Sequence, residues 1–79
     1  MDIIILGSTG SIGKATLNAL NKSNKNFNVK LLTTNNNIKL LFNQSIKYKC
    51  KKVVIFDKEK FFKSSYKKRF LKKKIKVYF

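Results

Sequence analysis

The chain has 79 residues, with 19 basic and three acidic side chains, and a formal charge of +16. A chain of this length is one domain or part of one. It has no histidine, and its acids, Asp2, Asp57 and Glu59, are scattered, which excludes an imidazole metal site and a paired-carboxylate catalytic site. The single cysteine, Cys50, excludes an internal disulfide and suits a reducing compartment.

The first predicted elements follow a strand, helix, strand pattern. Residues 3–6 are uniformly apolar and mostly β-branched, which predicts a strand buried on both faces. Glycines punctuate residues 7–13 and predict a turn, after which residues 11–22 form a helix. The apolar positions of this helix are Ile12, Ala15, Leu17, Ala19 and Leu20. The polar segment 21–26 ends the helix, and residues 27–33 form the second strand.

The second half continues the alternation. Residues 37–48 predict a helix with Ile38, Leu41, Phe42 and Ile46 on one side, and residues 53–56 predict a third strand. Asp57 can cap a third helix whose apolar stripe is Phe61, Phe62, Tyr66 and Phe70. Alternating residues 75–79 predict a fourth strand. The βαβαβαβ order indicates the α/β class, as a partial Rossmann-like domain with a parallel sheet of about four strands.

One motif carries chemistry, the glycine run between the first strand and the first helix. Gly7, Gly10 and Gly13 have the spacing G-x-x-G-x-x-G, a variant of the dinucleotide-binding fingerprint. We expect Gly7 to end the strand where a Cβ would obstruct the turn, Gly10 to let a pyrophosphate approach, and Gly13 to pack the helix tightly. The hydroxyls of Thr9 and Ser11 and the apolar side chain of Ile12 complete the expected site. The alternative is a tight turn that binds no ligand.

The end of the second strand bears on which cofactor binds. A site that prefers NAD usually places an acid there to hold the ribose 2′-hydroxyl. Residues 33–37 contain no acid, so a 2′-phosphate would meet threonine hydroxyls, asparagine amides and Lys39 without repulsion. We therefore favour NADP(H). The asparagine run also has a structural interpretation, in which it turns the chain and caps the second helix, and the two are compatible.

Other features have simpler interpretations. We interpret the aromatic stripe as core and Cys50 as a bystander, because no histidine can activate its thiol. The positive charge admits a nucleic-acid partner, but Arg69 is the single arginine, and lysine shares A/T-rich codons with the abundant Asn, Ile, Phe and Tyr. Mutational bias therefore explains the charge better. No apolar run approaches the roughly 20 residues of a membrane span, and we expect a cytoplasmic protein.

The glycine motif and its flanks resemble a known family. The run from Ile5 to Gly13, followed by Thr16 and Leu17, resembles the opening of 1-deoxy-D-xylulose 5-phosphate reductoisomerase. The likeness continues through residues 29–33 and 37–41 to Gln44. The resemblance implies NADPH-dependent conversion of 1-deoxy-D-xylulose 5-phosphate to 2-C-methyl-D-erythritol 4-phosphate, in non-mevalonate isoprenoid biosynthesis. It also implies a divalent metal, Mg or Mn, and a homodimer.

By position, Thr9, Gly10, Ser11 and Ile12 match the family's NADPH contacts in the loop. Asn35, Asn36 and Asn37 match its contacts after the second strand, where the family often has glycine, a basic or polar residue, and asparagine. Asn37 keeps the common identity, and the other two depart from it.

Members of the family are several times longer than this chain. Residues 1–79 therefore correspond to the N-terminal part of an NADP(H)-binding domain, without catalytic residues, metal ligands or the catalytic and C-terminal domains. We expect the chain alone to be inactive. The alternatives are a fragment of another NADP-dependent reductase and a small basic nucleic-acid-binding protein.

Overall fold

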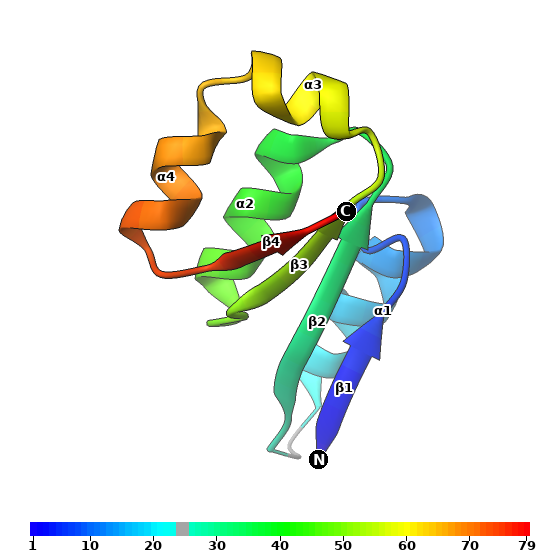
Figure 1. Cartoon of the computed structure of the whole chain (residues 1–79). Coiled ribbons are helices and arrows are strands. Elements are labelled where there is room, and N and C mark those ends of the chain that lie inside the picture. The colour runs from blue at the N-terminus through cyan, green and yellow to red at the C-terminus, as the bar shows by residue number, and fades with distance from the viewer. Residues whose placement is uncertain (24–25) are drawn as a thin grey trace.

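The computed structural model describes residues 1–23 and 26–79 (Figure 1). The elements are β1 (Asp2–Ile5), α1 (Ser11–Lys22), β2 (Asn28–Thr34), α2 (Ile38–Lys47), β3 (Lys52–Ile55), α3 (Lys58–Lys63), α4 (Tyr66–Lys72) and β4 (Lys76–Tyr78). Within the predicted polar segment 21–26, residues 24 and 25 lie outside the described residues. Helix α1 ends at Lys22, where Ser23 closes it with a backbone hydrogen bond to Leu20.

The four strands form one parallel sheet in the order β1-β2-β3-β4, which confirms the predicted fold class. A row of paired residues, Ile5, Leu32, Val53 and Val77, runs across the sheet. Because every crossover moves one strand in the same direction, crossovers of one hand place all helices on the same face. Figure 1 shows this arrangement, with α1 and α2 behind the sheet. The carboxyl ends of the strands meet at one edge.

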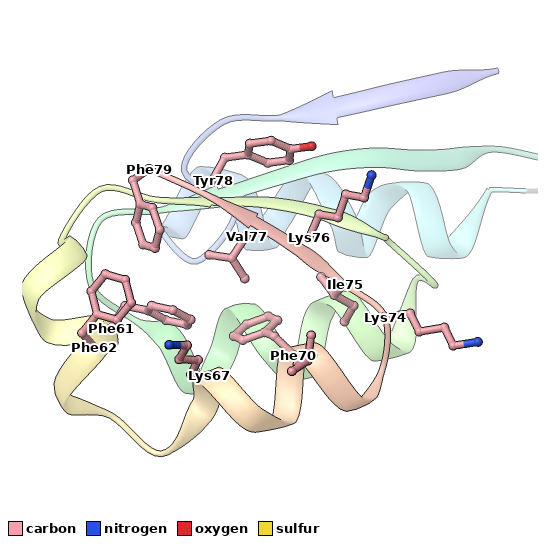
Figure 2. Close-up of a pocket in the computed structure, with 11 residues that line it drawn as sticks. Phe61, Phe62, Lys67, Phe70, Lys74, Ile75, Lys76, Val77, Tyr78 and Phe79 are labelled. Carbon is pink, nitrogen blue, oxygen red and sulfur yellow. The ribbon is translucent and has the colours of Figure 1, made fainter.

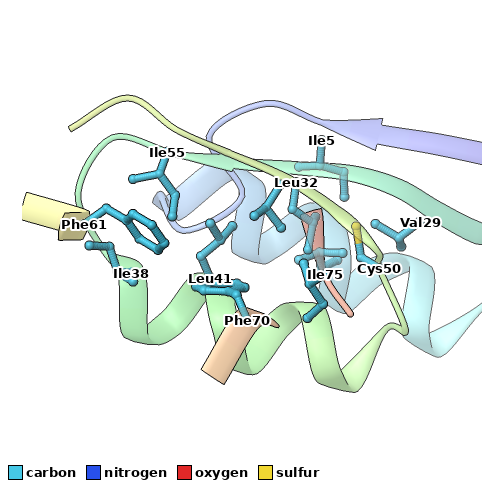
Figure 3. Close-up of a cluster of buried hydrophobic side chains, with 12 residues drawn as sticks. Ile5, Val29, Leu32, Ile38, Leu41, Cys50, Ile55, Phe61, Phe70 and Ile75 are labelled. Atoms are coloured by element: carbon cyan, nitrogen blue, oxygen red, sulfur yellow. The ribbon is translucent and has the colours of Figure 1, made fainter. Parts of the chain in front are cut away.

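The core lies between the covered face of the sheet and the helices (Figure 3). Leu32 and Ile55 of the strands face Leu41 of α2 and Phe70 of α4, and all four side chains are buried. Two neighbouring aromatic rings surround Phe70, that of Phe42 at 5.1 Å and that of Phe61 at 6.0 Å between centroids. The prediction that the aromatic stripe belongs to the core is confirmed at Phe61 and Phe70. At Phe62, which is half exposed, it is wrong.

One prediction about buried faces is wrong. Strand β1 is not buried on both faces: Ile4 is 62% exposed, and Leu6, predicted as the last strand residue, lies in the turn after β1 and is 75% exposed. In the described part of the chain no helix covers the second face of the sheet, and β1 lies at the sheet edge. In α1 only Leu17 and Leu20 turn towards the sheet, whereas Ile12, Ala15 and Ala19 are exposed.

The predicted third helix is two helices, α3 and α4, separated at Ser64 and Ser65. Asp57 caps α3 as predicted, accepting a hydrogen bond from the Lys60 amide at 3.0 Å. The backbone of Ser64 is extended, and its hydroxyl donates to the Phe61 carbonyl at 2.6 Å. Serine competes in this way with the helical hydrogen bonds, so the apolar stripe could not reveal the break.

The core predicts a contrast between two phenylalanines. Phe70→Leu should lower the free energy of unfolding by about 1–2 kcal/mol, because it removes buried ring atoms that neighbours cannot replace. Phe62→Leu, at a half-exposed position, should change it by less than about 0.5 kcal/mol. Urea unfolding of both variants measures the difference. Equal losses would contradict the packing described here.

Candidate functional site: the glycine-rich loop

The loop after β1 is a sharp turn that leads directly into α1. Gly7 has a φ of +66°, in the left-handed region that favours glycine. The Gly10 amide donates to the Gly7 carbonyl at 3.0 Å, and Gly10 is the N-cap residue of α1. The predicted strand-to-helix turn is therefore confirmed.

The three glycines of the loop differ in what the structure requires at their positions. A Cβ on Gly13 would lie 2.6 Å from the Ser8 Cα and would also collide with the Gly7 carbonyl oxygen. The prediction of tight helix packing at Gly13 is thus confirmed, although the contact is with the backbone of the loop. The prediction for Gly7 is wrong in its reason: a Cβ there would meet nothing within 4 Å, and the positive φ is what requires glycine. At Gly10 a Cβ would lie at an ordinary 3.4 Å from the Gly7 carbonyl oxygen.

The N-terminus of α1 offers hydrogen-bond donors. Ser11, Ile12 and Gly13 form its first turn, where N–H groups have no acceptor within the helix. Gly10, having no side chain, cannot cap them. Gly10, Ser11 and Ile12 are exposed, and the helix dipole adds partial positive charge at this end. Such an arrangement binds anions, phosphate groups in particular.

The loop is held against the end of β2. The Gly7 amide donates to Thr33 Oγ1 at 2.7 Å, and the Ser8 amide donates to the Thr33 carbonyl at 2.9 Å. The hydroxyls of Thr9 and Thr34 lie 2.6 Å apart. Because Thr33 and Thr34 are buried, the expectation that their hydroxyls would meet a 2′-phosphate is wrong. These hydroxyls support the loop instead.

The asparagine segment lies at the same edge of the sheet. Asn35, Asn36 and Asn37 directly follow Thr34 and are exposed. Asn37 caps α2, its side chain accepting from the Leu40 amide at 3.3 Å, so the capping interpretation is confirmed for this residue. The Asn35 carbonyl accepts from the Asp57 amide at 2.8 Å, which ties the segment to the chain after β3. The bond between Thr9 and Thr34 brings the two predicted groups of site residues together.

Sequence reasoning missed the residues that support the loop from behind. Ser8 is fully buried, and it exchanges two hydrogen bonds with the buried side chain of Gln44 on α2. Ser8 lies within the glycine motif and Gln44 within the family resemblance, but neither pattern assigns them a supporting role. A buried polar pair needs a partner, but the sequence does not show which partner, since 36 positions separate the two.

Two other features lie away from the loop. An apolar hollow of about 720 Å³ lies between α3, α4 and β4, lined by aromatic residues including Phe61, Phe62 and Phe79 (Figure 2). Cys50 is fully buried, and burial raises the pKa of its thiol, so the reactive thiolate is disfavoured there.

Residues 1–23 and 26–79 contain neither a candidate metal site nor a candidate membrane-spanning helix. The acidic and cysteine side chains described there do not gather into a group that could hold a metal ion. None of the described helices has the length and apolarity to cross a membrane.

Comparison with known proteins finds the family that the glycine motif resembles. The family model for 1-deoxy-D-xylulose 5-phosphate reductoisomerase matches residues 3–79. Relatives of that name include proteins from Porphyromonas gingivalis, 47% identical over 60 residues, and Wigglesworthia glossinidia brevipalpis, 49% identical over 59 residues. These matches cover 76% and 73% of this chain, but 16% and 15% of the relatives. The chain, which spans less than a fifth of the length of these relatives, belongs to the 1-deoxy-D-xylulose 5-phosphate reductoisomerase family.

Proposed function

We propose that residues 1–79 are the N-terminal part of the NADP(H)-binding domain of a reductoisomerase, and that the loop of residues 7–13 binds the pyrophosphate of NADPH. One observation carries the proposal: an exposed Gly10 stands at the uncapped N-terminus of α1, at the carboxyl edge of a parallel sheet. Dinucleotides bind at this edge in folds of this type.

The residues present fit such a cofactor. At Gly10 no side chain stands between the first-turn N–H groups and an incoming phosphate. Ser11 adds an exposed hydroxyl, and the exposed Ile12 gives an apolar wall for the nucleotide. Thr9 has a different role, because its hydroxyl is paired with Thr34. NADPH supplies the hydride of the family's reaction, while residues of this chain bind and orient the cofactor.

The asparagine segment is the proposed site for the adenosine 2′-phosphate. Asn35 and Asn36 are exposed after the end of β2, and Asn37, whose side-chain oxygen caps α2, is exposed beside them. Lys39 is exposed in the same turn and adds positive charge. The nearby Asp57 carboxylate is engaged in capping α3. Phosphate is thus met by amides and a lysine rather than by a free carboxylate.

The reaction on 1-deoxy-D-xylulose 5-phosphate is proposed for the longer protein, with a divalent metal and a homodimeric assembly. The described acids of this chain do not fit a metal site, because Asp57 caps α3 and Glu59 pairs with Lys63 at 3.3 Å. Asp2 lies at the opposite end of the sheet, at the start of β1. Metal and substrate must therefore be held by residues outside this segment.

The proposal predicts that the chain binds NADPH more tightly than NADH. The difference should be roughly tenfold or more, since a charge-assisted hydrogen bond to the 2′-phosphate contributes about 1.5–3 kcal/mol. Calorimetric titration with both cofactors measures it. Equal affinity would contradict the proposed role of the asparagine segment. Displacement of NADPH by duplex DNA at physiological salt would favour the nucleic-acid alternative.

The glycines predict separable effects on stability and binding. Gly7→Ala should cost about 1–2 kcal/mol of unfolding free energy, because alanine is strained at positive φ. Gly13→Ala should cost about 1–3 kcal/mol or more, because its Cβ has no room. Gly10→Ala should cost about 1 kcal/mol or less, because alanine is a poorer N-cap than glycine, yet weaken NADPH binding roughly tenfold, since its Cβ stands where the phosphate approaches. An unchanged affinity in Gly10→Ala would contradict the proposed contact.

Because residues 1–23 and 26–79 form no metal site, we expect that the 79-residue chain alone does not reduce 1-deoxy-D-xylulose 5-phosphate. NADPH absorbance should stay constant when substrate and Mg²⁺ or Mn²⁺ are added, because no described side chains hold the metal and substrate together. A complete relative, such as the Porphyromonas gingivalis protein, serves as the positive control. Substrate-dependent loss of absorbance with the short chain would overturn this division of roles.

A further inference from the structure

Gln44 and Ser8 form a closed pair of hydrogen bonds between α2 and the glycine loop. The Ser8 hydroxyl donates to Gln44 Oε1 at 2.8 Å, and Gln44 Nε2 donates to the Ser8 carbonyl at 2.8 Å. Ser8 is fully buried and Gln44 is 7% exposed. Water therefore cannot easily replace either bond, and a buried polar group that loses its partner is costly.

The two hydrogen bonds of the pair require a neutral amide side chain at position 44. The Ser8 carbonyl can only accept, so the amide nitrogen must face it, and the amide oxygen is then placed to accept from the Ser8 hydroxyl. An apolar side chain would remove the amide from the Ser8 carbonyl and leave the Ser8 hydroxyl with only its longer contact to the Thr33 carbonyl, at 3.2 Å. Asparagine has the same groups but is one methylene shorter, so it could not reach both from the same position on α2.

Ser8 is the residue through which the loop is anchored. It lies between Gly7, in its left-handed conformation, and the turn that ends at Gly10. Its Cα forms the surface on which Gly13 packs. The position of Ser8 therefore decides where the first turn of α1 lies. Helix α2, which carries Gln44, also begins directly after its N-cap Asn37, which belongs to the proposed 2′-phosphate site.

We infer that Gln44 is a positioning residue for the dinucleotide site: by holding Ser8, it fixes the glycine loop in its binding conformation before the cofactor arrives. This inference rests on the proposed function, because it concerns the same loop. It makes a further claim about the unliganded chain, in which the loop should be less rigid without Gln44 although Thr33 and Thr34 still hold it. A preorganised loop loses less conformational entropy when its ligand binds.

The test uses Gln44→Met and Gln44→Asn in the 79-residue chain, with Ser45→Ala as a matched control. Ser45 is also buried on α2, but its hydroxyl bonds to Leu41 within the same helix at 2.8 Å. Hydrogen exchange of the Ser8 and Gly10 amides, measured without NADPH, reports on the loop, and the amides of β3 report on the whole fold. Calorimetric titration then gives the NADPH affinity.

In both Gln44 variants, the Ser8 and Gly10 amide hydrogens should exchange roughly tenfold faster or more, while the amides of β3 keep their protection. NADPH affinity should fall by a similar factor, and Ser45→Ala should change neither. Unchanged loop exchange in the Gln44 variants would overturn the inference, whether or not NADPH binds. Equal loss of protection in loop and β3 would also overturn it, because Gln44 would then support the fold in general. Failure of the unsubstituted chain to bind NADPH, with its loop amides protected, would count against the proposed function alone.

Discussion

The close contact between Gly13 and the backbone of the loop is the constraint on which the site depends. Because a Cβ at this position would collide with Gly7 and Ser8, the first turn of α1 can lie directly on the turn that leaves β1. That contact fixes the direction of the helix relative to the strand. It also places the free N–H groups of the first turn at the carboxyl edge of the sheet, where a phosphate can meet them. A larger residue would displace the helix and those donors together.

The loop does not hold this shape by itself. Its amides and hydroxyls bond to Thr33 and Thr34 of β2 and to Gln44 of α2, residues that are 25 to 36 positions away in the chain. These partners are buried, so they are unavailable to a ligand. The polar groups exposed at this edge include those of Ser11, the asparagine segment and Lys39. On the proposed function, this division between buried support and exposed contact leaves two groups of polar residues for a ligand with separated phosphates.

Much of this could be predicted from the sequence, since β-branched runs, a capping aspartate and glycine spacing act locally. The four strands, the turn at Gly7 and the cap at Asp57 follow from such local signals. Non-local outcomes could not be predicted. The exposure of Ile4 depends on which face of the sheet the helices cover, and the inward turn of Thr33 depends on the loop beside it. The break at Ser64 was missed because the aromatic periodicity continues across it.

The charge of the chain and the geometry of the loop act on anions in different ways. The lysines, most of them exposed, attract any polyanion over long range, an attraction that salt screens beyond a Debye length of about 8 Å at physiological ionic strength. The first-turn N–H groups of α1 would act at hydrogen-bond distance and in fixed directions. The first effect would favour any anion in proportion to its charge. On the proposed function, recognition of a particular anion depends on the loop and the asparagine segment, where few groups interact but their positions are fixed.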